Sequence, residues 1–159
     1  MSTQPRYKIP VSVLVVIHDP ALNVLLLERA DRPGFWQSVT GSLDAPDEDR
    51  RTAALREVRE ETGIDAPVTA LLDWQQQTVF EIYPHWRDRY APGVTHNTEH
   101  SFSLCVPAGT RPNLAAREHL DYQWLPCLQA AAKCFSPSNR EAILRLPAVV
   151  NPNGARPDR

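Results

Sequence analysis

The stretch 41–64, GSLDAPDEDRRTAALREVREETGI, organises the chain, because it predicts a loop, a helix and a helix stop in that order. We expect the helix to begin near Glu48 and to end at Thr62. Gly63 suits the left-handed position that follows a helix, and Asp47 or Asp44 is expected to cap the start. The apolar stripe of this helix consists of three residues, Ala54, Leu55 and Val58.

The same helix carries three acids on one face. Glu57, Glu60 and Glu61 stand at i, i+3 and i+4, so their carboxylates lie close together and repel one another at neutral pH. Arg56 and Arg59 can screen part of that repulsion. A hard divalent cation would do more, since Mg²⁺ prefers oxygen ligands and is commonly shared between carboxylates and substrate phosphates. The pattern therefore predicts a magnesium site on this helix.

These residues resemble a named motif. From Glu48 the chain reads E-x7-R-E-V-x-E-E-x-G-I, which is similar to the signature of the Nudix hydrolases, G-x5-E-x7-R-E-U-x-E-E-x-G-U. Six residues, not five, separate Gly41 from Glu48. Either the loop carries a one-residue insertion, or Asp47 takes the place of the first acid. The insertion is the preferred interpretation, because loops absorb extra residues more easily than helices do.

The rest of the chain predicts an α/β protein. Apolar and alternating runs favour strands at 9–17, 23–29, 36–42, 101–106 and 119–125, with one or two more between 68 and 83. A polar connection is expected at 85–100, a loop at 107–118, and two short helices at 128–134 and 138–146, the second capped by Ser136 or Ser138. The resemblance implies the Nudix fold, an α/β/α sandwich with a mixed sheet. The predicted domain is 1–147, followed by a loose tail at 148–159.

Composition limits the partners. The net charge of −2 and the absence of a basic patch disfavour nucleic acid. No apolar run approaches the length of about 20 residues that a membrane helix needs, and no signal peptide is evident at the start of the sequence. Cys105, Cys127 and Cys134 form no paired motif and are interpreted as reduced, mostly buried thiols. We therefore expect a cytoplasmic protein that acts on a small molecule.

Stretches outside the motif resemble one subgroup of this family, which hydrolyses dihydroneopterin triphosphate in bacterial folate synthesis. They include FWQSVTGS at 35–42, RYAPGVT at 89–95, NTE at 97–99, and SNR at 138–140. Cys134-Phe135 stands where the subgroup has Ser-Trp. The resemblance implies substrate contacts by seven residues, Lys8, Arg29, Thr40, Phe80, Glu81, Ile82 and Tyr83. Cationic side chains suit a polyphosphate, although Arg29 could instead pair with Asp31 or Glu28.

The predicted reaction is Mg²⁺-dependent hydrolysis, with Mn²⁺ as a substitute, that gives dihydroneopterin monophosphate and diphosphate. The metal ligands are expected to be Glu57, Glu60, Glu61 and, as the resemblance implies, Glu118. Glu57 and Glu118 are both candidates for the general base. An alternative substrate is a nucleoside triphosphate such as dATP. An alternative of another class is an inactive Nudix domain that binds a nucleotide. We expect a monomer or a homodimer.

Overall fold

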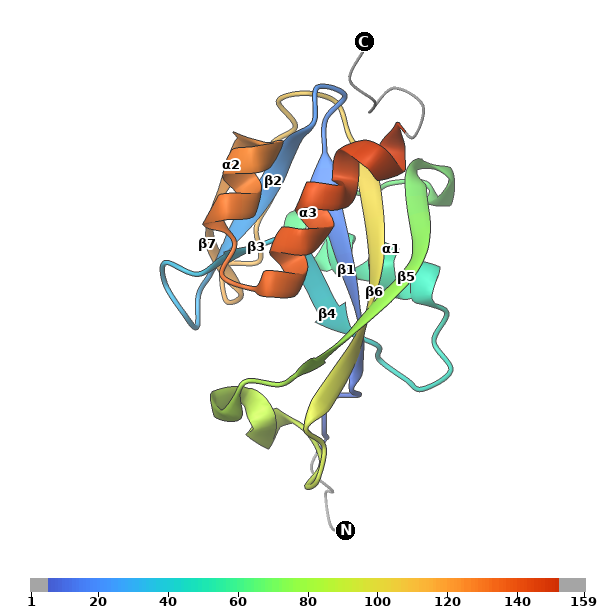
Figure 1. Cartoon of the computed structure of the whole chain (residues 1–159), viewed down its shortest axis with the longest axis vertical. Helices are drawn as coiled ribbons and strands as arrows, with labels where there is room; N and C mark the ends of the chain where they lie inside the picture. The colour runs from blue at the N-terminus through green and yellow to red at the C-terminus, as the bar shows by residue number, and fades with distance from the viewer. Residues whose placement is uncertain (1–5, 152–159) are drawn as a thin grey trace.

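The structure is a computed structural model that describes residues 6–151. It contains one seven-stranded mixed sheet and three α-helices (Figure 1). The strands are β1 (Val11–His18), β2 (Asn23–Arg29), β3 (Trp36–Gln37), β4 (Val39–Ser42), β5 (Leu71–Glu81), β6 (His96–Cys105) and β7 (His119–Pro126). The helices are α1 (Arg50–Thr62), α2 (Cys127–Lys133) and α3 (Pro137–Val150), and the 3₁₀ turns are η1 (Val68–Ala70) and η2 (Pro84–Arg89).

Strand β1 lies at the centre of the sheet, and its side chains alternate between two cores. Val13, Val15 and Ile17 pack with α1 on one face, whereas Leu14 and Val16 pack with α2 and α3 on the other. This arrangement follows from the period of two in a strand that is apolar from Val13 to Ile17. Figure 1 shows α2 and α3 on the near face and α1 behind the sheet. The expected α/β/α sandwich is confirmed.

Helix α1 ends as expected but begins later. Gly63 has φ 71° and its N–H donates to the carbonyl of Arg59, which closes the helix. The start lies at Arg50, and the cap is Asp49, whose carboxylate accepts from the Thr52 N–H at 3.1 Å. The expected caps Asp47 and Asp44 are therefore wrong. A carboxylate caps a helix only from the residue just before its first turn, and Asp47 lies two residues before Asp49.

Three other expectations differ from the structure. The run 36–42 divides at Ser38 into β3, which pairs with β2, and β4, which pairs with β1. The connection expected at 85–100 contains η2 and the first half of β6, which pairs with β5 and with β1. Helix α3, capped by Ser136, continues through Pro147 to Val150, so the expected tail begins with helix. Residues 152–159 of that tail lie outside the described residues.

The three cysteines are free within the described chain, and Cys105 is exposed whereas Cys134 is buried. No helix of residues 6–151 has the length and apolar character that crossing a membrane requires.

The sheet opens at one end, and this opening positions the site. Strand β1 pairs with β2 at His18 and Val24, and β4 takes that neighbouring position from Ser12 to Val15. Strands β5 and β6 extend past the body of the sheet as a two-stranded arm, with η2 at its end (Figure 1). The gap between the arm, β4 and the start of β7 leads to a large cavity.

Candidate active site

A cavity of about 850 Å³ lies at the open end of the sheet. Its walls come from β1, β4, the arm, the start of β7 and the segment before α3. Nine of the residues expected at the site line it: Lys8, Arg29, Thr40, Glu57, Glu61, Phe80, Ile82, Tyr83 and Glu118. Residues separated by more than 100 positions in the sequence therefore meet in one cavity of the size that small-molecule sites have.

Gly41 lets Glu57 reach this cavity. Glu57 comes from α1, on the far face of the sheet, and its carboxylate lies directly over the Gly41 backbone. A Cβ atom at position 41 would stand 2.1 Å from the Glu57 Cδ and 2.3 Å from its Oε1. A side chain at this position would have to displace the Glu57 carboxylate. Gly41, the glycine that opens the motif, therefore allows the Glu57 carboxylate to approach the backbone closely.

Glu57 and Glu61 form a buried acid pair. Their residues are 9% and 2% exposed. Burial raises the pKa of Glu57, and burial together with the neighbouring Glu57 raises the pKa of Glu61 well above its usual value. Among residues 6–151, Glu61 Oε1 has no hydrogen-bond partner, and His119 Nε2 lies 3.6 Å from it. Since burial lowers the pKa of His119 to about 4, the imidazole is neutral at pH 7 and supplies no positive charge.

Arg56 holds the loop and the helix together beside this pair. Its Nη1 donates to Glu57 Oε1 at 2.8 Å, and its Nε donates to Glu48 Oε2 at 2.9 Å. Glu48 Oε1 in turn accepts from the Asp44 N–H at 2.8 Å. Asp47 is exposed. Glu48 therefore occupies the first acidic position of the motif, which agrees with the preferred one-residue insertion in the loop.

Two of the expected site residues face away from the cavity. Glu60 is exposed on α1, and its Oε2 lies 3.3 Å from Arg56 Nη1. Glu81 is exposed at the end of β5 and accepts from Arg87 Nη2. Phe80 and Ile82 point into the cavity, so the alternation of a strand directs Glu81 outward. The expectation that all four residues 80–83 contact the substrate is therefore not supported at Glu81.

Cationic side chains line the same cavity as the acids. Arg29 is bound by Asp31, at 2.7 Å from Nε and 2.8 Å from Nη2, and its guanidinium lies 4.5 Å from the centre of the Trp86 ring. Arg29 thus pairs with Asp31 and also lines the cavity. Burial, followed by the charges of Arg89 and Arg29, lowers the pKa of Lys8. This cluster of cations favours an anionic ligand.

The acids fit a divalent cation that is completed by substrate. Within residues 6–151, no three acidic, histidine or cysteine side chains form a closed metal cluster. Mg²⁺, however, usually keeps waters and substrate phosphates among its ligands and takes only one or two carboxylates from the protein. The unpartnered buried Glu61 oxygen and the charge repulsion between Glu57 and Glu61 are both relieved by a cation. Glu57 and Glu61 are therefore the residues that would hold it, with Glu118 at the rim.

Sequence reasoning missed several residues that line the cavity. They are Ser12, Trp86, Arg89, Asn97, Glu99, His119, Phe135 and Asn139. Asn97 and Glu99 were obscured because the first half of β6 is polar. Counting back in steps of two from Ser103 and Ser101 would have placed both on the face that α3 covers.

Comparison with known proteins defines the class of this site. The family model for the NUDIX domain matches residues 8–146, so the chain belongs to the Nudix family. It is a Nudix hydrolase, and hydrolases of this family use divalent metal ions.

Its relatives include characterised enzymes. Dihydroneopterin triphosphate diphosphatase of Escherichia coli K12 is 50% identical over 140 residues, which cover 86% of this chain and 91% of that protein. The enzyme of the same name from Haemophilus influenzae is 44% identical over 141 residues, 87% of each. The structure of the E. coli dihydroneopterin triphosphate pyrophosphohydrolase superposes with a TM-score of 0.81 at 49% identity, covering 91% of this chain and 98% of that one.

Proposed function

We propose that this enzyme hydrolyses 7,8-dihydroneopterin 3′-triphosphate to dihydroneopterin monophosphate and diphosphate. The observation that carries the proposal is the buried Glu57–Glu61 pair, with an unpartnered oxygen, at the same cavity as Lys8 and Arg29. This arrangement suits a cation bound between carboxylates and a polyphosphate. Relatives that are 44% to 50% identical over most of the chain carry the name of this activity.

The proposed role of each residue follows from its position in the cavity. Glu57 and Glu61 hold the divalent cation, which we propose to be Mg²⁺ with Mn²⁺ as a substitute. When bound, the cation neutralises phosphate charge and lowers the pKa of water. Lys8 and Arg29 bind phosphate oxygens and orient the chain, and Thr40 contributes its backbone beside Glu61. Glu60, on the outer side of Arg56, balances the guanidinium charge.

Either Glu57 or Glu118 acts as the general base that removes a proton from the attacking water. Glu57 Oε1 already accepts a hydrogen bond from Arg56, which commits this carboxylate to a fixed position. Glu118 is exposed at the rim, directly before β7, and its charge acts on Glu61. We therefore assign the base to Glu118 and the holding of the cation to Glu57. The cytoplasmic location and the monomeric or dimeric state stay predictions.

A substrate panel with product analysis tests the function. With Mg²⁺, dihydroneopterin triphosphate should be cleaved to the monophosphate with release of diphosphate, and with a higher kcat/KM than dATP. Release of single phosphates, or a preference for dATP, would contradict the proposal. Binding of either compound without any Mg²⁺-dependent product would identify an inactive binding domain instead.

Substitution Glu61→Gln tests the metal assignment. It removes the charge that repels Glu57, so the metal-free protein should keep its fold and should not lose thermal stability. Turnover should fall by roughly three orders of magnitude, an effect of the size that loss of a preorganised charge contact has. Mg²⁺ should raise the Tm of the wild-type protein but not that of the variant. A variant that keeps near-full Mg²⁺-dependent activity would exclude Glu61 as a ligand.

A further inference from the structure

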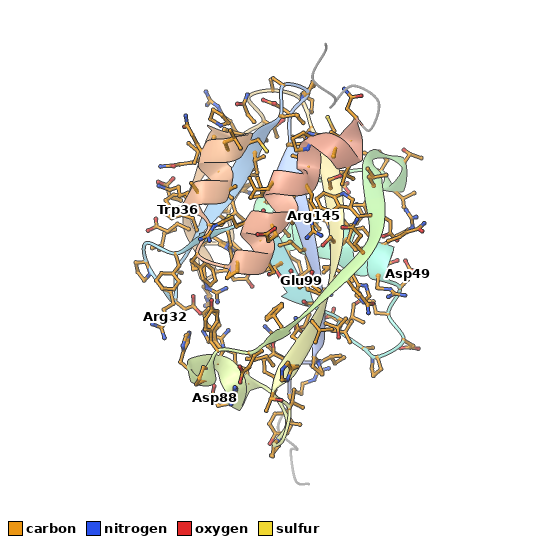
Figure 2. All side chains as sticks on the ribbon, viewed as in Figure 1. Arg32, Trp36, Asp49, Asp88, Glu99 and Arg145 are labelled. Carbon is orange, nitrogen blue, oxygen red and sulfur yellow. The ribbon has the colours of Figure 1, made fainter. Side chains whose placement is uncertain are left out.

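A second pair of polar side chains lies in the cavity, away from the acid pair. Asn97 and Glu99 stand two residues apart on β6, so both point to the face that α3 covers. They are 3% and 5% exposed, and both line the cavity. Figure 2 shows Glu99 between the sheet and the first turns of α3. Neither residue has a part in metal binding or in the handling of phosphate.

Each of the two retains an acceptor that none of the described residues satisfies. Asn97 Nδ2 donates to Ser12 Oγ at 2.7 Å, but Asn97 Oδ1 has no partner. Glu99 interacts with the Ser138 hydroxyl, and its Oε1 has no partner. The neighbouring Asn139 differs, because its amide both accepts from Ser38 N and donates to Ser38 Oγ. Buried acceptors without partners are costly and uncommon, which indicates that a ligand supplies the donors.

The surroundings of this pair suit a flat ring. Phe80 of β5 stands directly opposite Asn97 in the strand register, so the aromatic side chain lies beside the amide on the same face. Ile82, Tyr83 and Phe135 add apolar surface to the same cavity, and the Tyr83 and Phe135 rings are 6.4 Å apart. An apolar slot with a few placed acceptors is the usual form of a site that orients a heterocycle.

The strand register also places this pair at a suitable distance from the phosphate end. Glu99 pairs with Ser12 on β1, and Ser12 pairs with Ser42 on β4, next to the Gly41 that adjoins Glu57. Two interstrand spacings separate the backbone of Glu99 from that of Ser42, about 10 Å. A ligand whose ring and polyphosphate are joined by a short chain can therefore occupy both ends at once.

We infer that Glu99 and Asn97 read the amino-pyrimidinone edge of the substrate ring and select it against rings that lack this edge. The inference rests on the proposed function and deepens it. An ionised carboxylate only accepts hydrogen bonds. It therefore matches the two adjacent donors of a pterin, the ring N–H and the exocyclic amino group. Adenine presents one donor beside one acceptor, so its ring nitrogen faces the carboxylate oxygen and repels it. The spare oxygen of Asn97 accepts a further N–H.

Substitution Glu99→Gln tests the inference, because glutamine offers one acceptor and one donor and thus matches adenine. Rates are measured at pH 8 with Mg²⁺ on dihydroneopterin triphosphate and on dATP. The ratio of the two kcat/KM values should fall roughly 10- to 100-fold, the discrimination that a bidentate pair provides. A purely structural role would lower both rates together and leave the ratio unchanged, which would overturn the inference. Glu141→Gln, an exposed change on α3 outside the cavity, is the matched control and should keep the wild-type ratio.

A binding measurement on the wild-type protein makes the test independent of the variant. Dihydroneopterin and adenosine, both without phosphate, are titrated as competitive inhibitors of hydrolysis. Dihydroneopterin should bind at least roughly tenfold more tightly, and equal or weaker binding would contradict the inference. Failure of the proposed function looks different, because the wild-type enzyme would then release no diphosphate from dihydroneopterin triphosphate. Activity on that substrate with an unchanged ratio in the variant overturns the inference alone.

Discussion

At the scale of single residues, the contact between Gly41 and the Glu57 carboxylate links the loop to the chemistry. The atoms that a Cβ would meet are the far end of a flexible side chain, at 2.1 to 2.4 Å. Gly41 does not have a positive φ, so an alanine fits the backbone. Gly41 therefore matters more for the position of the Glu57 carboxylate than for folding.

Substitution Gly41→Ala should separate these two roles. The new methyl group displaces the Glu57 carboxylate, and a shift of about 1 Å at a reacting centre can cost on the order of 10²-fold in rate. The free energy of unfolding should change by less than about 1 kcal/mol, since alanine also restricts the unfolded chain. Mg²⁺-dependent turnover and urea unfolding measure the two effects. An alanine variant with wild-type turnover would show that Glu57 works equally well from a displaced position.

At the scale of the element, one hydrogen bond caps the start of α1, and the sequence alone does not identify the residue that accepts it. Four acids, Asp44, Asp47, Glu48 and Asp49, precede the helix, and aspartate is among the residues that N-caps prefer. Asp49 takes the role, and Figure 2 shows it at the edge of the molecule beside α1. Glu48 is instead drawn to Arg56. The contact with Arg56 thus fixes which residue is left to cap the helix.

The capping assignment predicts a difference between two similar substitutions. Asp49→Ala should lower the free energy of unfolding by about 1 kcal/mol, the usual value of an N-cap. Asp47→Ala changes an exposed loop residue and should stay within about 0.5 kcal/mol of wild type. Thermal or urea unfolding of both variants checks this. Equal effects of the two substitutions would contradict the assignment of the cap to Asp49.

The end of α1 and the polar half of β6 show what a sequence can and cannot predict. Gly63 was predictable because only glycine readily adopts the left-handed conformation that ends a helix there. The acids Glu57 and Glu61 were predictable because their spacing is a property of one helix. The face on which Glu99 lies follows from the period of two, but its burial does not, because it depends on α3 folding over the polar half of β6. Nor was the outward position of Glu60 predictable, since the neighbouring Arg56 and the sheet decide which acids of the face are covered.

At the scale of the whole molecule, the α/β/α class followed from the order of the strands and helices, but the cavity did not. It exists because β1 leaves β2 after one paired position and is joined by β4 instead. Glu118, directly before β7, lies at the rim of this cavity, where α1 presents its acids. The acid pair and the Asn97–Glu99 pair then occupy two parts of one cavity, and both contain buried oxygens without partners.

This arrangement makes global stability depend on pH in a way that can be assigned to Glu99. Burial raises its pKa from 4.5 to about 7. The folded protein therefore favours the protonated form, and the stability that this form contributes is complete below about pH 4.5 and is lost as the pH rises through 7. Glutamine cannot ionise and keeps its contribution. At pH 8 the Glu99→Gln variant should be more stable than wild type by up to about 3 kcal/mol, and at pH 5 the two should be similar.

Urea unfolding at pH 5 and pH 8 measures this difference, and Glu141→Gln should match wild type at both values. The comparison between variants removes the other titrating groups, such as Glu61 and His119, because they are common to all three proteins. A variant that is less stable than wild type at pH 8 would mean that the ionised carboxylate is already satisfied inside the protein. A more stable variant would mean that the wild-type fold carries an unpaired acceptor at pH 8, where hydrogen-bond donors from the substrate ring would offset the cost.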